Sequence, residues 1–238
     1  MELHRSMKII PGQRIIALAG GGGKTTSLYA LSRECNAQGK RTVLMTTTHI
    51  GPPKGADVDL YKTSDFDGIR KTWEAGRIAA VGIVGEDGRM VSPDRETYDF
   101  VSREAEAIYI EADGSKCLPL KFPDKHEPAV PQNADRVIVL CGLSALDQPF
   151  DGFCHRAALA REKLGIKEEL IDEKIIAKVL TAGYGEYHPV IILNQADSPG
   201  LVKRGEYIAD LLKNEGIQDV SVISLHQILD GQKAWCEK

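Results

Sequence analysis

Several features that define large protein classes are missing from this sequence. The cysteines are odd in number and include no C-x-x-C pair: Cys35, Cys117, Cys141, Cys154 and Cys236. This usage favours reduced thiols over a disulfide framework. No apolar run is long enough to span a bilayer, and residues 1–6 contain no apolar signal-peptide core. We therefore expect a cytoplasmic protein with no membrane partner.

An excess of positive charge is also missing. The 30 Lys and Arg residues are outnumbered by 34 Asp and Glu, which gives a net charge of −4 and argues against non-specific binding of nucleic acid. Internal repeats are absent, so a solenoid is excluded. The hydrophobic content of 42% and charged content of 27% are those of an ordinary globule. We expect one α/β domain over residues 1–238.

A glycine-rich loop stands out between a predicted strand and a predicted helix. The apolar run 14–18 precedes Gly20, Gly21, Gly22 and Gly23, and Lys24, Thr25 and Thr26 open a helix that ends near residue 38. Glycines allow successive N–H groups to face one point, where the helix N-terminus adds positive partial charge. The pattern predicts phosphate binding, with an exposed Lys24 reaching the β- and γ-phosphates and Thr25 ligating Mg²⁺.

The spacing of this loop differs from the usual phosphate loop, which would need glycine in place of Leu18. It fits a shorter loop, Gly20-x-x-Gly23-Lys24-Thr25, similar to the ATP sites of murein ligases. A dinucleotide-binding fingerprint fits less well, because Thr25 stands where the third glycine belongs and no acidic residue closes the second strand.

Continuous apolar runs alternate with helical periodicity along the rest of the chain. We predict strands at 42–46, 78–84, 107–110, 137–140, 190–193 and 220–223, and helices at 66–74, 93–105, 157–164, 167–180 and around 208–212. The alternation indicates a three-layer fold of the P-loop NTPase type, with a mostly parallel sheet and helices on both faces.

Acidic residues follow the predicted strand 107–110. Glu111 and Asp113 lie downstream of a phosphate loop, where such folds place the acidic partner of Mg²⁺ and of the attacking water. We interpret Lys24, Glu111 and Asp113 as candidate catalytic residues, and Thr25 with Glu111 or Asp113 as the metal ligands. The alternative is a plain exposed turn.

Residues 112–131 form a long connector with four prolines and three lysines. A connector of this length is usually functional or disordered, and prolines oppose disorder. We predict a lid over substrate or phosphate, with an exposed connector as the alternative. Candidate substrate contacts are Ser115, Lys116, Lys121 and His126 in the connector, Thr48 and His49 at the end of the second strand, and Arg156.

The predicted strand 190–193 delivers Asn194-Gln195-Ala196-Asp197 to the same edge of the sheet. This tetrapeptide resembles the Asn-Lys-x-Asp signature with which GTPases bind guanine, with Gln195 in place of lysine. A turn that caps the strand is the alternative. We predict that Asn194 and Asp197 contact the base, and the choice between ATP and GTP stays open.

These motifs together resemble the YqeC family. The resemblance covers residues 14–197 and rests on the glycine loop, Thr47-Thr48-His49, the stretch 111–116, Pro119-Leu120-Lys121, His126-Glu127-Pro128 and the stretch 194–197. Members of that family are associated with selenium-dependent molybdenum hydroxylases as accessory or selenium-cofactor factors. The resemblance implies a role in maturation of a molybdenum enzyme, with that enzyme or its maturation proteins as partner.

The function favoured by the sequence is a Mg²⁺-dependent P-loop nucleotidase or nucleotide-gated maturation factor. One alternative is a small-molecule kinase or ATP-dependent ligase that uses the γ-phosphate on a substrate held by Lys116, Lys121 and His126. A second is a non-catalytic module that changes shape on nucleotide binding and hands on a cofactor.

Overall fold

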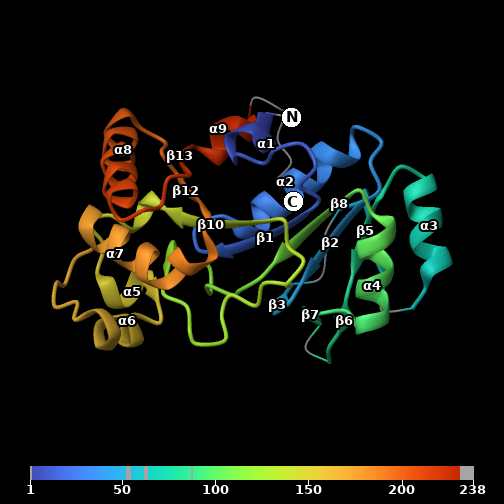
Figure 1. Ribbon diagram of the computed structural model, residues 1–238, viewed down its shortest axis with the longest axis horizontal. Helices are drawn as coiled ribbons and strands as arrows, with labels where there is room; N and C mark the ends of the chain where they lie inside the picture. Colours follow the sequence, from blue (N-terminus) through green and yellow to red (C-terminus); the bar gives the residue numbers. More distant parts are fainter. Residues whose placement is uncertain (1, 52–54, 62–63, 87, 231–238) are drawn as a thin grey trace.

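The chain folds around a parallel sheet whose eight strands come from most of its length (Figure 1). The computed structural model describes residues 2–51, 55–61, 64–86 and 88–230. The strand order is β13 (Val220–Val222), β12 (Val190–Asn194), β10 (Arg136–Gly142), β1 (Ile15–Gly20), β8 (Ala107–Glu111), β2 (Thr42–Thr46), β5 (Ile78–Val81) and β4 (Val58–Tyr61). Every pairing in this sheet is parallel.

The central strands are apolar on both faces because helices cover both. All residues of β1, β2, β5, β8 and β12 are buried, which explains why these strands read as continuous apolar runs rather than alternating ones. The predicted α/β class with a mostly parallel sheet between helical layers is confirmed.

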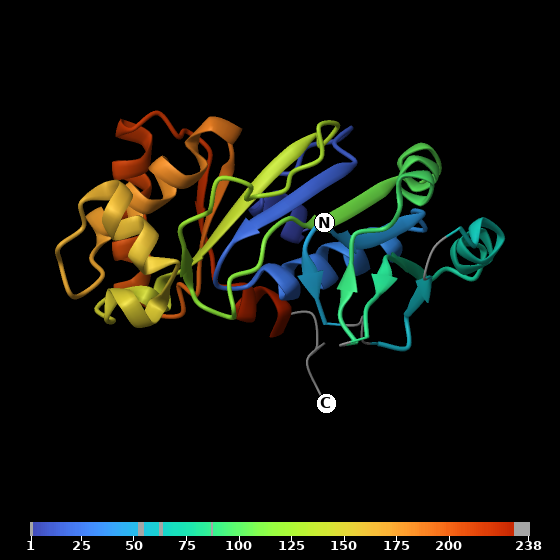
Figure 2. The same ribbon diagram turned by 90° about the horizontal axis from the view of Figure 1, so that it is seen from below.

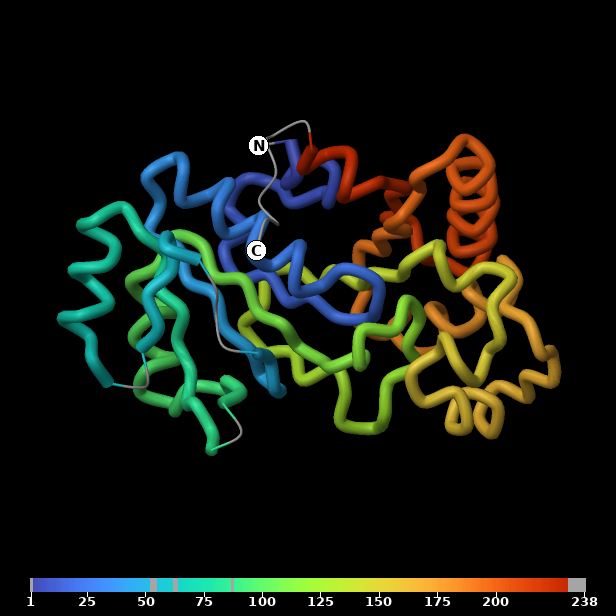
Figure 3. The backbone as a smooth tube through the Cα atoms, turned by 180° about the vertical axis from the view of Figure 1, so that it is seen from behind, coloured from blue at the N-terminus to red at the C-terminus, as the bar shows by residue number. Residues whose placement is uncertain are grey.

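One face of the sheet packs against three helices. They are α1 (Glu2–Ser6), α2 (Lys24–Asn36) and α9 (Leu225–Asp230). Leu18 and Leu140 point to this face and share a core with Leu28 and Leu31 of α2. Seen from behind, α9 lies beside α1 (Figure 3), and both helices contribute to the same core.

The other face carries two separate groups of helices at opposite ends of the sheet (Figure 2). One group consists of α5 (Phe150–Phe153), α6 (Ala157–Leu164), α7 (Glu173–Tyr184) and α8 (Pro199–Asn214), and the other of α3 (Phe66–Glu74) and α4 (Arg95–Glu104). Ala19 and Val139 pack against the first group, and Val43 and Ile108 against the second. Two 3₁₀ turns span Leu143–Ala145 and Gly185–Tyr187.

Two small sheets complete the fold. β3 (His49–Ile50), β7 (Met90–Val91) and β6 (Ile83–Val84) form an antiparallel sheet, and β9 (Leu120–Lys121) pairs with β11 (Cys154–His155) in parallel. The predicted strand 78–84 is therefore two strands that break at Gly82. A Cβ atom at Gly82 would lie 2.5 Å from the Met90 side chain, so the close approach of β7 requires glycine there.

The helix predicted at 167–180 begins later, at Glu173. The side chain of Asp172 accepts a hydrogen bond from the N–H of Ile175 and so caps α7. Among the described residues, no helix combines the length and the apolar character needed to cross a membrane. The described cysteines Cys35, Cys117, Cys141 and Cys154 are free thiols, and Cys236 lies outside the described residues.

The connector 112–131 differs from the predicted lid because it is part of the core. Leu120 and Phe122 are buried in the cluster beneath α7, and Pro123 lies against Gly183 of that helix. The N–H of Ala129 donates to the carbonyl of Ala112 at 2.9 Å. The segment is thus fixed at both of its ends and in the middle.

Candidate functional site

The glycine loop joins β1 to α2 at the carboxyl edge of the sheet, and its glycines are required by close backbone contacts. Gly20 has φ +88°, and a Cβ atom there would lie 2.1 Å from the carbonyl oxygen of Leu140. Gly23 has φ +134°, and its Cβ would lie 2.6 Å from Nδ2 of Asn194. Both positions need glycine for conformation and for space.

The N-terminus of α2 presents unpaired donors. The first helical hydrogen bond runs from the N–H of Ser27 to the carbonyl of Gly23. In the described part of the chain, no acceptor is paired with the N–H groups of residues 23–26. Four such groups at the start of a 13-residue helix form a site suited to an anion.

Lys24 is not exposed, in contrast to the expectation from its place at a loop end. Its side chain is 3% exposed, and Nζ lies 2.5 Å from the carbonyl oxygen of Gly20, 3.1 Å from Oγ of Ser115 and 3.3 Å from Oδ1 of Asp113. The physical reason is the adjacent strand β8, which brings a carboxylate within reach of the loop. The ammonium group is thus held inside the site by protein oxygen atoms.

Thr25 and Glu111 meet as the sequence predicts. The Thr25 hydroxyl donates to Oε2 of Glu111 at 2.8 Å, because β8 lies next to β1 in a register that sets Glu111 opposite Leu18. Burial raises the pKa of Glu111, and the charge of Lys24 and the Thr25 hydrogen bond oppose this shift only in part. Thr25 itself is exposed, as is Thr26.

Asp113 is fully buried at the centre of a polar network. Its Oδ2 atom accepts from the N–H of Gly20 at 3.1 Å and from the Tyr184 hydroxyl at 3.2 Å, and lies 3.2 Å from Nζ of Lys121. Oδ1 has Lys24 as its ion-pair partner but, among the described residues, no hydrogen-bond donor. Tyr184 belongs to α7, and nothing in the sequence pattern pointed to it.

Lys121 and Arg156 both form ion pairs within the protein, Lys121 in its interior and Arg156 at a half-buried position. The Lys121 side chain is fully buried, and Nζ lies 2.9 Å from Oε2 of Glu127. Arg156 pairs with Glu127 at 3.1 Å and with Asp124 at 3.0 Å. Burial alone would raise the pKa of Glu127, but the hydrogen bonds from Lys121 and Arg156 lower it. The predicted substrate contact by Lys121 is therefore replaced by an internal ion pair.

The other candidate substrate residues are divided between structural and exposed positions. Thr48 is half-buried, and its N–H donates to the Thr46 hydroxyl at 3.0 Å. His49, Lys116 and His126 are exposed. Ser115 is buried beside Lys24. Of this set, Ser115 is the one that the structure brings next to the phosphate loop.

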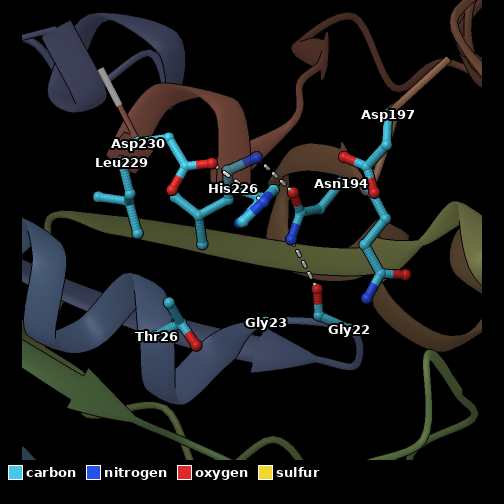
Figure 4. Close-up of a pocket in the computed structure, with 10 residues that line it drawn as sticks. Gly22, Gly23, Thr26, Asn194, Asp197, His226, Leu229 and Asp230 are labelled. Carbon is cyan, nitrogen blue, oxygen red and sulfur yellow. Dashed lines mark hydrogen bonds and ion pairs between the residues drawn. The ribbon is translucent and has the colours of Figure 1, made fainter. Parts of the chain in front are cut away.

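Asn194 connects three segments at the edge of the sheet. Its Nδ2 donates to the carbonyl of Gly22 at 2.8 Å, and its Oδ1 accepts from the N–H of Leu225 at 2.9 Å (Figure 4). Gly22 belongs to the glycine loop and Leu225 begins α9. The side chain of Asn194 thereby ties the loop to the helix that follows β13.

A pocket of about 410 Å³ lies between the glycine loop and α9. It is lined by Gly22, Gly23, Thr26, Asn194, Gln195, Asp197, Leu225, His226, Leu229 and Asp230. Asp197 is exposed, and its Oδ1 accepts from the Ser224 hydroxyl at 2.5 Å. Figure 4 shows the pocket between Thr26 on one side and His226 and Leu229 on the other.

The sequence pattern indicated the loop and the 194–197 stretch but not α9, which supplies the far wall of this pocket. The helix has six residues, too few for a clear periodic signal. Ser224, which orients Asp197, was likewise missed, because the strand that precedes it ends in an ordinary polar turn.

The donor set fits a nucleotide with its metal. Unpaired N–H groups and an ammonium suit phosphate, and a hydroxyl beside a carboxylate suits Mg²⁺, which prefers a few hard oxygen ligands together with phosphate oxygens. The pocket next to the loop has apolar walls from Leu225 and Leu229 and an acceptor from Asp197. The pocket thus lies directly beside the glycine loop, which supplies part of its lining.

Comparison with known proteins places the chain in a family. The sequence model described as YqeC protein matches residues 16–158. "Uncharacterized protein YqeC" of Escherichia coli (strain K12) is 31% identical over 141 residues, which cover 54% of this chain and 51% of the relative. "Adenylyl-sulfate kinase, chloroplastic" of Catharanthus roseus is 25% identical over 153 residues, 64% of this chain and 48% of that relative. The chain thus spans about half the length of the curated relatives it matches.

Proposed function

Because the chain belongs to the YqeC family and carries a phosphate loop, we propose that it is a Mg²⁺-dependent nucleoside triphosphatase that serves as an accessory factor in maturation of selenium-dependent molybdenum hydroxylases. The observation that carries the nucleotide part is the contact of Thr25 with Glu111 at 2.8 Å, beside Lys24 and the unpaired N–H groups of α2. The maturation role rests on the family resemblance.

Each residue of the site has a distinct part in this proposal. The N–H groups of residues 23–26 and the ammonium of Lys24 bind the phosphates. Thr25 and Glu111 hold Mg²⁺, which when bound neutralises charge that develops on the phosphates. Glu111 is favoured over Asp113 as the metal-side carboxylate, because it contacts Thr25 whereas Asp113 is already paired with two lysines.

The pocket beside the loop is proposed to hold the base. Asp197 leaves one carboxylate oxygen without a partner among the described residues, and such an acceptor pairs with an N–H donor of a purine. Guanine offers two adjacent donors and adenine one, so Asp197 favours GTP, while the shorter glycine loop, similar to that of murein ligases, favours ATP. Gln195 contributes its amide where GTPases have lysine.

Lys24→Ala tests the nucleotide assignment. A charged phosphate contact contributes about 1.5–3 kcal/mol, so the variant should bind Mg²⁺-nucleotide roughly ten- to a hundredfold more weakly by calorimetry. Lys203→Ala on α8, an exposed lysine, is the matched control and should bind like wild type. Equal affinities of all three proteins would remove the phosphate-loop assignment.

A small-molecule kinase is the second candidate, favoured by the match to a protein named adenylyl-sulfate kinase. Phosphate release from labelled nucleotide, measured with and without a candidate hydroxylase or small-molecule acceptor, separates the possibilities. Release of inorganic phosphate supports the nucleotidase, and transfer of label to the acceptor supports the kinase. Tight binding without either reaction supports a nucleotide-gated binding module.

A further inference from the structure

A second buried lysine, outside the phosphate loop, forms an ion pair with Asp113. Lys121 lies on β9, and its side chain is fully buried. Its Nζ atom donates a hydrogen bond to the carbonyl of Gly114 at 2.7 Å and has two ion-pair partners, Oε2 of Glu127 at 2.9 Å and Oδ2 of Asp113 at 3.2 Å. Because its side chain is fully buried among these partners, Lys121 does not face a ligand.

Phosphate competes with Asp113 for the ammonium of Lys24. Two of the three N–H donors of Lys24 are hydrogen-bonded, to the carbonyl of Gly20 and to the Ser115 hydroxyl, and Asp113 is its ion-pair partner, so an ammonium that moves toward phosphate moves away from the carboxylate. The contact with Asp113 is the weakest by geometry, since it spans 3.3 Å and, in the described part of the chain, Oδ1 accepts no hydrogen bond. The loss of this contact nevertheless removes a cation from a fully buried carboxylate, which is strongly unfavourable unless another cation remains.

The second cation is Lys121. It contacts Oδ2, the oxygen on the side away from Lys24, together with the Gly20 N–H and the Tyr184 hydroxyl. These three contacts do not depend on where Lys24 points. Building on the proposed function, we infer that Lys121 is a positioning residue that keeps Asp113 neutralised, so that Lys24 is free to bind phosphate.

Binding of ATP in EDTA tests this inference without the metal. In Lys121→Met, Asp113 has Lys24 as its remaining lysine partner and holds it more firmly, so ATP should bind at least about tenfold more weakly. In the double variant Asp113→Asn with Lys121→Met, no buried carboxylate retains Lys24, and the affinity should return to within about threefold of wild type. Lys125→Met, at an exposed lysine of the same segment, is the control and should bind like wild type.

Two results would overturn the inference. One is unchanged ATP affinity in Lys121→Met, and the other is a double variant as weak as the single variant, which is the result expected if Lys121 only fills space. If Lys121→Met does not fold, the single variant Asp113→Asn is compared with the double variant Asp113→Asn with Lys121→Met. The inference predicts equal ATP affinities for these two proteins. A weaker affinity in the double variant contradicts it. If wild type binds GTP but not ATP, the same comparison of variants is made with GTP. Wild type that binds neither nucleotide, with or without Mg²⁺, would instead refute the proposed function and with it this inference.

Discussion

The proposed phosphate end and the proposed base end of the candidate site are built in different ways. At the phosphate end, Lys24 of α2, Asp113 just after β8 and Lys121 of β9 are buried, and both lysines pair with Asp113. At the base end, Asp197 is exposed, and its side chain accepts a hydrogen bond from the Ser224 hydroxyl. The phosphate end is therefore part of the core, whereas the base end is attached to its edge.

This difference predicts which substitutions affect the stability of the fold and which affect ligand binding alone. A substitution at the phosphate end disturbs a buried charge network and should lower stability as well as binding. A substitution of the exposed Asp197 at the base end meets solvent and should change selectivity with little effect on stability.

The largest expected effect is on stability at Asp113. Asp113→Ala leaves two buried ammonium groups without their shared carboxylate, so the free energy of unfolding should fall by about 3–5 kcal/mol. Asp197→Ala, the matched change at the base end, should stay within about 0.5 kcal/mol of wild type. Urea unfolding of both variants measures the difference. Similar losses in the two variants would contradict the contrast between the two ends.

The next effect is on base selectivity. If Asp197 accepts two hydrogen bonds from guanine, Asp197→Asn should cost about 1–3 kcal/mol of GTP affinity and should improve binding of xanthosine triphosphate, since the amide donates to the oxo group that replaces the amine. Competition binding of ATP, GTP and xanthosine triphosphate to wild type and variant provides the measurement. ATP and GTP affinities that are equal and unaltered by the variant would assign residues 194–197 to a strand-end turn.

The smallest effect concerns a polar cluster far from both ends, where His4 of α1 is buried. His4 forms an ion pair with Glu34 through Nδ1, Nε2 lies 2.5 Å from the Tyr109 hydroxyl, and Cys35 lies 3.4 Å from Nε2. Burial alone would lower the pKa of His4, but the hydrogen bonds to Cys35 and Glu34 outweigh it and raise this pKa above 6.5. Burial likewise opposes the shift of Glu34, whose pKa the His4 contacts lower to about 2.

The sign of the pH dependence follows from these two shifts. The raised pKa of His4 contributes stability that is complete below pH 6.5 and is lost as pH rises through the folded-state value. The lowered pKa of Glu34 contributes stability above pH 4.5 that is lost as pH falls toward about 2. Lys40 is a further charged group that interacts with Cys35 of this cluster.

The stability difference between wild type and His4→Gln should therefore be largest between pH 4.5 and 6.5 and should decrease above this window. Chemical unfolding of both proteins across this range and at higher pH provides the measurement. His126→Gln, at an exposed histidine, serves as control and should show no such window. A difference that is constant with pH would mean that the His4 and Glu34 contact does not depend on charge.

The fold was predictable where local and tertiary preferences agree. Continuous apolar runs identified all of the central strands, and helices 66–74 and 157–164 coincide with α3 and α6. The sequence also predicted that a carboxylate after strand 107–110 lies near Thr25, because parallel strands end at the same edge of the sheet.

The charge network was not predictable from the sequence for a physical reason. Lys121 looks like one of several lysines in a proline-rich connector, and its burial follows from the pairing of β9 with β11, whose residues are 34 positions apart in the register of Leu120 with Cys154. The burial of Lys24 also depends on a pairing between distant segments, because Asp113, the carboxylate that holds it, follows β8, and β8 pairs with β1. Local pattern carries no information about such pairings.

The hydrogen bond between Asn194 and Gly22 joins residues that are 172 positions apart, and that between Thr25 and Glu111 spans 86. The site consequently exists only after nearly the whole sheet has assembled, and an N-terminal fragment that contains the glycine loop would lack it. A nucleotide that binds the assembled site acts by mass action on the folding equilibrium of the entire chain, adding about 2.7 kcal/mol at a concentration of about 100 times Kd. Ligand supply would in this way set how much folded protein is present.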